Sequence, residues 1–181
     1  RRFGGVVAVQ DADIDVPQGA IVGLIGPNGA GKTTMFTMIS GFIPPDKGVV
    51  IFKGRDITAL PTHMRAQQGI ARTFQIVKPF AGLSVRENIA VGAYLRHARR
   101  VDALAKADHV AAQLGLGDVA DKPAGALTVA GRKRLELARA LATEPEILLL
   151  DEVLAGLNPS EIRDIVPVIQ SIRASGVTIL I

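Results

Sequence analysis

Residues 26–33 carry the feature that most restricts how this chain can fold. They fit the pattern of glycine, four residues and then Gly-Lys-Thr, between an apolar run and a run that favours helix. The glycines let successive backbone N–H groups turn toward one centre and form a concave anion site, and the following helix adds the positive end of its dipole. The segment therefore predicts a phosphate-binding loop between a strand and a helix. The residues expected to contact the phosphates are Gly26, Pro27, Asn28, Gly29, Ala30, Gly31, Lys32, Thr33 and Thr34.

Two features outside this loop fit the same chemistry. Lys32 can reach the outer phosphates of a nucleoside triphosphate, and the Thr33 hydroxyl can bind Mg²⁺. The apolar run ILLL ends at Asp151, and a carboxylate at the end of a buried strand is a suitable second magnesium contact. Glu152 follows, where a carboxylate can accept a proton from an attacking water. The alternatives are a glycine-rich turn with an exposed lysine and a pair of surface acids.

The rest of the chain alternates between strand-like and helix-like segments, which predicts an α/β fold with a parallel-sheet core. Strands are expected over 6–9, 12–16, 20–25, 49–52, 55–58, 69–74, 146–151 and 177–181, and helices over 32–40, 62–68, 101–114 and 159–175. Two further helices are expected to follow Ser84 and Leu127. Ser84 and Glu87 predict a capping box at the start of the first, and Asn158 with Pro159 predicts a side-chain cap and a first-position proline for the helix over 159–175. The order of these expected strands and helices suggests three parts: 1–77 with N-terminal β strands and the phosphate loop, 78–139 as a helical insertion, and 140–181 as the continuation of the core. Because the chain ends within an expected strand, we expect it to be truncated at its C-terminus.

Composition narrows the function without deciding it. The 181 residues are 48% hydrophobic and 21% charged, as in a globular domain. The absence of cysteine excludes disulfides and cysteine metal sites. No apolar run approaches the roughly 20 residues that span a bilayer. The net charge of +4 fits an anionic partner, although solvated surface charge explains it equally well.

A basic cluster, Arg132, Lys133 and Arg134, lies where an apolar helical pattern begins. Cations at a helix N-terminus oppose its dipole. One interpretation is that these side chains lie in solvent or pair with acids of the insertion.

The order of these motifs resembles the ATP-binding subunits of ATP-binding-cassette (ABC) transporters, over essentially the whole chain. The resemblance implies a P-loop NTPase fold with an N-terminal antiparallel β subdomain and an inserted helical subdomain, and it implies ATP and Mg²⁺ as ligands. It makes residues 127–131 the signature motif and residues 155–158 the D-loop. It also implies a second hypothesis for the basic cluster at 132–134, namely that these cations face a triphosphate held by a second subunit. It assigns catalytic roles to Glu152, Gln75 and Lys32, metal contacts to Thr33, Gln75 and Asp151, and further nucleotide contacts to Phe3, Thr128 and Gly131.

One branch of the family is most similar: the runs ARTFQIVKPFAGLSVRENI and DEVLAGLNPSE resemble the ATPases of branched-chain amino acid importers. The resemblance implies a second ABC ATPase subunit, two membrane permeases and an external substrate-binding protein as partners, at the cytoplasmic face of the cell membrane. Val129 and Ala130 depart from the family's signature, which has glycines there. Asn158 replaces the D-loop aspartate.

Two other functions stay open on sequence alone. The first is an ABC ATPase that acts on nucleic acid or ribosomes; we do not expect it, because aromatic residues make up 4% of the chain and tryptophan is absent. The second is a regulatory module that binds nucleotide and hydrolyses it weakly because its signature is degenerate. The complete phosphate loop and Glu152 argue against the second.

Overall fold

A four-stranded parallel sheet, in the order β3-β8-β7-β6, forms the centre of the protein. The structure is a computed structural model and describes residues 1–74 and 78–181. The strands are β1 (Arg2–Phe3), β2 (Val6–Val7), β3 (Ile21–Val22), β4 (Ile51–Phe52), β5 (Arg55–Asp56), β6 (Ile70–Arg72), β7 (Ile147–Leu149) and β8 (Thr178–Leu180). The helices are α1 (Lys32–Ile39), α2 (Thr62–Gln67), α3 (Val85–Ala93), α4 (Arg100–Gln113), α5 (Val129–Leu141) and α6 (Pro159–Ala174), with 3-10 turns η1 (Gly117–Val119) and η2 (Ala124–Ala126).

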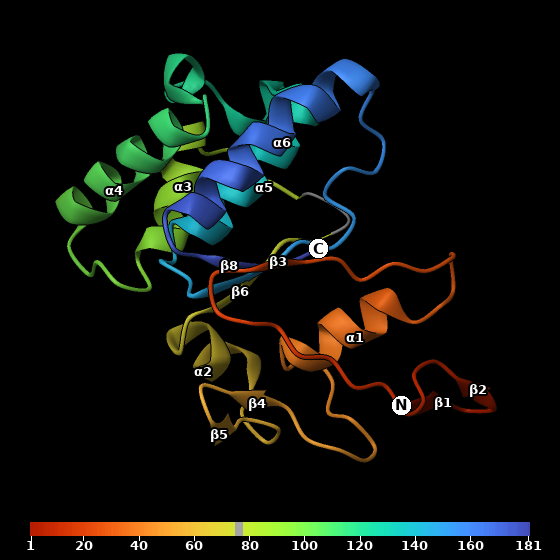
Figure 1. The fold of residues 1–181 in the computed structure, drawn as a ribbon. Coiled ribbons are helices and arrows are strands. Elements are labelled where there is room, and N and C mark those ends of the chain that lie inside the picture. The colour runs from red at the N-terminus through yellow and green to blue at the C-terminus, as the bar shows by residue number, and fades with distance from the viewer. Residues whose placement is uncertain (75–77) are drawn as a thin grey trace.

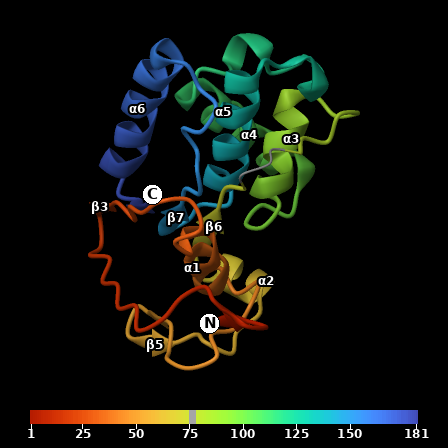
Figure 2. The same cartoon turned by 90° about the vertical axis from the view of Figure 1, so that its right-hand side faces the viewer.

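Helices cover both faces of this sheet, as expected of a parallel sheet. Helices α3, α4, α5 and α6 lie above it in Figure 1, and α1, α2 and the hairpin β4–β5 lie below. The view turned by 90° shows the same two layers (Figure 2). Helix α3 packs against both α4 and α5. The architecture is that of a P-loop NTPase: a parallel-sheet core with helices and short antiparallel strands.

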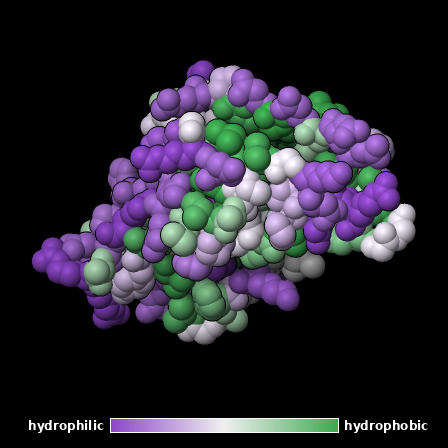
Figure 3. Space-filling view, turned by 90° about the horizontal axis from the view of Figure 1, so that it is seen from below, coloured by the Kyte–Doolittle hydropathy of each residue, from purple (hydrophilic) through white to green (hydrophobic). Residues whose placement is uncertain are grey.

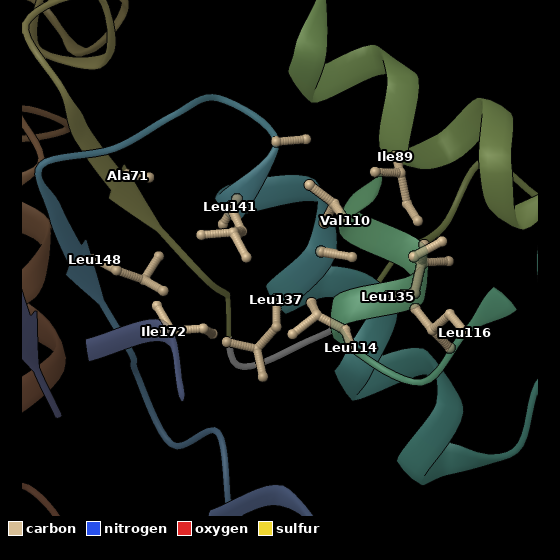
Figure 4. Packing of buried hydrophobic residues seen from close by; sticks show 14 of the residues in the cluster. Ala71, Ile89, Val110, Leu114, Leu116, Leu135, Leu137, Leu141, Leu148 and Ile172 are labelled. Atoms are coloured by element: carbon tan, nitrogen blue, oxygen red, sulfur yellow. The ribbon is translucent and has the colours of Figure 1, made fainter. Parts of the chain in front are cut away.

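Successive side chains of the central strands point alternately to the two faces of the sheet, so the buried ones are divided between the upper and lower layers. Leu148 and Ile179 join the cluster under the upper helices, whereas their neighbours Leu149 and Leu180 join a smaller cluster with Phe36 of α1. Successive side chains of a strand point to opposite faces, so the continuous apolar runs serve both layers. Figure 4 shows side chains of α5 between the sheet and the other upper helices; those it labels are Leu135, Leu137 and Leu141.

A buried cation fixes the lower layer beneath the sheet. Arg65 of α2 is 1% exposed. It donates to the carbonyls of Met38 and Ile39 at the end of α1, and to those of Thr58 and Leu60 in the preceding loop. Burial lowers the pKa of this guanidinium, and the four carbonyls compensate its charge by hydrogen bonds. The C-terminal end of α1 is thereby tied to α2 and to the hairpin.

The predicted helices and the main caps are confirmed. Ser84 and Glu87 form the expected capping box at the start of α3, and Asn158 and Glu161 form another at the start of α6, with Pro159 in the first position. Pro167 lies inside α6, which runs through it as one helix.

The predicted strand over 12–16 is wrong, and the one over 20–25 is reduced to β3. The alternation at 12–16 is real, since Ile14 and Val16 are half-buried between exposed aspartates. A strand also needs a hydrogen-bonded neighbour, and this segment has no ladder partner among the described residues. The antiparallel part consists of the pairs β1–β2 and β4–β5.

The lower face combines hydrophilic side chains with hydrophobic ones (Figure 3). In the segments that form this side of the molecule, the exposed apolar residues include Phe42, Val49, Ile51 and Met64. Within the described parts of the chain, no helix combines the length and apolar character needed to cross a bilayer.

Candidate functional site: a nucleotide-binding loop and its acidic partners

The loop at 26–31 adopts backbone conformations that suit glycine. Gly29 and Gly31 have φ of +83° and +88°, in the left-handed region. A Cβ at Gly31 would also lie 2.1 Å from the carbonyl oxygen of Ala8. Gly31 is the N-cap of α1 and supplies no side-chain hydrogen bond. The first-turn N–H groups of α1 therefore face the loop without a side-chain acceptor from the cap, which suits an anionic ligand.

Lys32 begins α1 and turns back over this loop. Its ammonium donates to the carbonyl oxygens of Gly26, at 2.6 Å, and Pro27, at 2.9 Å. These contacts keep the charge directly above the segment that is expected to hold phosphate. The ammonium of Lys32 therefore lies against the first residues of the loop that is predicted to bind phosphate.

Thr33 and Asp151 come together from sites 118 positions apart in the chain. The Thr33 hydroxyl lies 3.4 Å from Asp151 Oδ1. Asp151 follows β7, and its side chain is 3% exposed. The predicted pairing of a loop hydroxyl with a strand-end carboxylate is therefore present in the geometry.

Arg72 is a member of this site that sequence reasoning missed. Its guanidinium pairs with Asp151 Oδ2 at 2.9 Å, and the two side chains are 8% and 3% exposed. Arg72 is paired with Leu149 across β6 and β7, so Arg72, Leu149 and Asp151 point to the same face of the sheet. The same guanidinium donates to the hydroxyls of Thr37 in α1 and of Ser40, the residue after this helix, and it lies over the rings of two phenylalanines, Phe42 and Phe74.

The signal that could have revealed Arg72 is a cation within an apolar strand. The run GIARTF predicts a strand of the buried sheet, and a buried arginine needs compensating acceptors, either a carboxylate or several carbonyl oxygens. Asp151 at the end of the neighbouring strand is the carboxylate that meets this need. The pairing of Arg72 with Asp151 depends on the order of the strands in the sheet, which cannot be read from the sequence.

Glu152 has an unusual backbone conformation next to Asp151. Its φ is +50°, left-handed for a residue with a side chain. The ammonium of Lys133, from α5, donates to its carbonyl oxygen at 3.0 Å. Burial lowers the pKa of Lys133, and the charge of Glu152 partly opposes this shift. Helix α5 therefore contacts the residue expected to be the catalytic base.

The residues present fit a magnesium ion. Mg²⁺ prefers oxygen ligands and is commonly held by one or two protein groups together with phosphate oxygens and water. Thr33 Oγ1 and Asp151 Oδ1 offer such a pair beside the loop. Within the described ranges no group of three or more His, Cys, Asp or Glu side chains could hold a metal.

Of the remaining predicted site residues, Phe3, Thr128 and Gly131 make other contacts within the chain. Gln75 lies outside the described residues. Phe3 is on β1, 47% exposed, with the guanidinium of Arg1 over its ring. The Thr128 hydroxyl caps α5 by accepting from the N–H of Gly131, and α5 lies in the upper layer, away from α1 below the sheet (Figure 1).

The three cations of the basic cluster have partners within the chain. Arg132 donates to the carbonyls of Leu127 and Gly125. Lys133 is 9% exposed and turns inward, so the hypothesis that it faces another subunit is wrong for this residue. Arg134 lies 4.0 Å from Asp164 of α6.

Comparisons with known proteins agree with this geometry. Residues 9–155 match the family described as ABC transporter. The chain is 37% identical to the high-affinity branched-chain amino acid transport ATP-binding protein BraF of Pseudomonas aeruginosa, over 99% of the chain and 77% of BraF. It is 38% identical to the lipopolysaccharide export system ATP-binding protein LptB of Acidithiobacillus ferridurans, over 97% of the chain and 73% of LptB.

Among solved structures, the ADP conformation of MJ1267, an ATP-binding cassette of an ABC transporter, superposes with a TM-score of 0.89 at 32% identity. The match covers 99% of this chain and 76% of MJ1267. The phosphate loop, the paired Thr33 and Asp151, the family match and the relatives agree: the chain belongs to the ABC transporter family, as an ABC-type ATPase subunit that binds ATP.

Proposed function

We propose that this chain is the ATP-hydrolysing subunit of an importer for amino acids, branched-chain ones first among them. The observation that carries the proposal is the Thr33–Asp151 pair, 3.4 Å apart beside a glycine-rich anion site. The 37% identity to BraF, whose name states branched-chain amino acid transport, supports the solute class. LptB is 38% identical to this chain, and its name states lipopolysaccharide export. The transported solute therefore needs a test of its own.

The binding step follows from the loop and the start of α1. The backbone N–H groups of residues 26–31 and of the first turn hold the phosphates of ATP, aided by the helix dipole. Lys32 exchanges its two carbonyl acceptors for phosphate oxygens. Thr33 and Asp151 would hold Mg²⁺, which neutralises charge on the phosphates when bound. Phe3 stacks on the adenine as a further part of the proposal.

The chemical step falls to Glu152. Its carboxylate accepts the proton of the water that attacks the γ-phosphate, and Gln75 orients that water or contacts the metal. Thr128 and Gly131 contact ATP held by a second subunit. Residues 1–77 and 140–181 form the core, and the insertion 78–139 carries the motion to two permeases at the cytoplasmic face of the membrane, supplied from outside by a substrate-binding protein.

The test compares Glu152→Gln with Glu146→Gln in the full-length protein. Glu146 precedes the same strand β7 at its other end and pairs with Lys53 at the surface, so it is a matched control. E152Q is expected to bind ATP normally and to lose hydrolysis by about 10²–10⁴-fold, the usual contribution of a general base. E146Q is expected to hydrolyse ATP at the wild-type rate.

Uptake in cells tests the solute. Cells that carry E152Q should lose uptake of leucine, isoleucine and valine, and cells that carry E146Q should keep it. Hydrolysis by E152Q at the wild-type rate would refute the assigned base. If E152Q loses ATP hydrolysis while cells that carry it take up all three amino acids normally, the proposed solute class is refuted. The assignment of the chain as an ATPase would not be affected by that result.

A further inference from the structure

Lys133 has an environment that packing alone does not explain. It lies one turn into α5, it is 9% exposed, and its ammonium donates to a backbone carbonyl rather than to a carboxylate. Burial of a cation is unfavourable, as the lowered pKa of this lysine reflects. An apolar side chain of the same length would avoid that cost. The presence of an ammonium therefore indicates a role for its hydrogen bond to the carbonyl that it reaches.

The place where it ends is the carbonyl of Glu152. This residue holds a left-handed backbone conformation, with φ of +50°. Such conformations are disfavoured for residues with a Cβ and persist where the surroundings determine them. A charge-assisted hydrogen bond at 3.0 Å to the carbonyl of that residue is such a determinant. The peptide group that follows Glu152 is thus held in place by a hydrogen bond from Lys133 of α5, a helix of the upper layer.

The neighbouring cations of α5 set Lys133 apart. Arg132 binds carbonyls of the segment just before its own helix, and Arg134 approaches α6. Lys133, between them, reaches across to the segment that follows β7. Lys133 shares a face of α5 with Leu137, one turn further along, and the rotation that buries Leu137 also directs the Lys133 ammonium to Glu152.

We propose that Lys133 is a positioning residue for Glu152: through the Glu152 carbonyl it fixes the backbone from which the catalytic carboxylate projects beside Asp151. This inference rests on the proposed role of Glu152 as general base. The bond also ties the helix that begins at the signature motif to the chain's own base, so that a displacement of α5 against the sheet displaces Glu152.

The first experiment removes the ammonium and keeps the stem. In the full-length protein, Lys133→Met is expected to lower kcat by about 10- to 100-fold, the scale of an ångström-level misplacement of a catalytic group. KM and the binding constant for Mg-ATP should change by less than about twofold, because Lys133 is not placed in the loop that binds ATP. Lys133→Arg, which keeps a cationic donor, should recover most of kcat.

Lys106→Met is the matched control. Lys106 is a half-buried lysine of α4, and its ammonium pairs with Glu144. Its substitution should leave kcat unchanged. Thermal unfolding of both methionine variants without nucleotide compares their stability, and the rates are measured well below the lower midpoint.

A double variant separates positioning from a structural role. If Lys133 acts through Glu152, then K133M should slow E152Q no further in single-turnover hydrolysis. Wild-type kcat in K133M, or an equal slowing by K133M in the wild-type and E152Q backgrounds, would overturn the inference. Wild-type hydrolysis by E152Q would instead overturn the proposed base, so the two failures are distinguishable.

Discussion

Replacement of Arg72 by methionine should destabilise the nucleotide-free protein severely, for an electrostatic reason. The change removes the guanidinium that pairs with Asp151 at 2.9 Å and keeps most of the apolar stem. Because both side chains are less than a tenth exposed, solvent cannot replace the lost partner. Removal of one member of a buried ion pair typically costs about 3–5 kcal/mol, since the other charge stays buried without compensation.

Two smaller losses accompany this one. Arg72 also donates to the hydroxyls of Thr37 and Ser40, each at 3.1 Å, and net hydrogen bonds of this kind contribute about 1 kcal/mol or less. The double variant R72M/D151N keeps these losses and removes the uncompensated carboxylate. It should therefore recover most of the stability that R72M loses and remain within about 2 kcal/mol of the wild type.

Urea unfolding of the full-length wild type, R72M, D151N and the double variant, without nucleotide or divalent metal, measures these differences. Near-ultraviolet circular dichroism shows which variants retain native packing. A loss below about 1 kcal/mol in R72M would refute the reasoning, because it would mean that the carboxylate is not desolvated. A double variant as unstable as the sum of the two single ones would refute it as well.

Three further predictions concern other parts of the fold. A Cβ on Gly92 would lie 2.1 Å from the Arg139 carbonyl, so Gly92→Ala should force α3 from α5 and cost about 1–3 kcal/mol or more in urea unfolding; an unchanged midpoint would contradict it. Asn158→Ala removes the cap of α6 and should cost about 1 kcal/mol, whereas Asn158→Asp, which can cap the helix, should cost far less. Burial raises the pKa of Glu136, against the opposing charge of Arg139; a raised native pKa means that stability falls as the pH rises from the unfolded pKa through the native one. Glu136→Gln should lack this fall, so its stability in urea relative to the wild type should increase as the pH rises from the unfolded pKa of about 4.3 through the native pKa, and a difference that does not change with pH would contradict the assignment.

The loop at 26–33 and Asp151 could be predicted because their information is local. Glycine spacing fixes the loop, and an apolar run that ends in an acid places that acid at the edge of a parallel sheet. The caps at Ser84 and Asn158 were predictable for the same reason, since each involves residues no more than three positions apart.

The parts that escaped prediction depend on relations between distant segments. Arg72 meets Asp151 only because β6 lies beside β7 in one register, and Lys133 meets Glu152 only because α5 has one rotation over the sheet. The strand expected at 12–16 failed for a related reason: alternation describes one face of a segment, but a strand forms only with a neighbour.

The resting position of Lys32 has a consequence for how phosphate is recognised. Its ammonium bridges two carbonyls at the start of its own loop, so the loop carries an internal substitute for part of its ligand. Entry of a nucleotide is then an exchange reaction, in which phosphate oxygens replace peptide oxygens around one ammonium. A phosphate group can supply two oxygens to the ammonium at once and so replace both carbonyls, whereas a ligand with a single acceptor would leave one of these hydrogen bonds unreplaced.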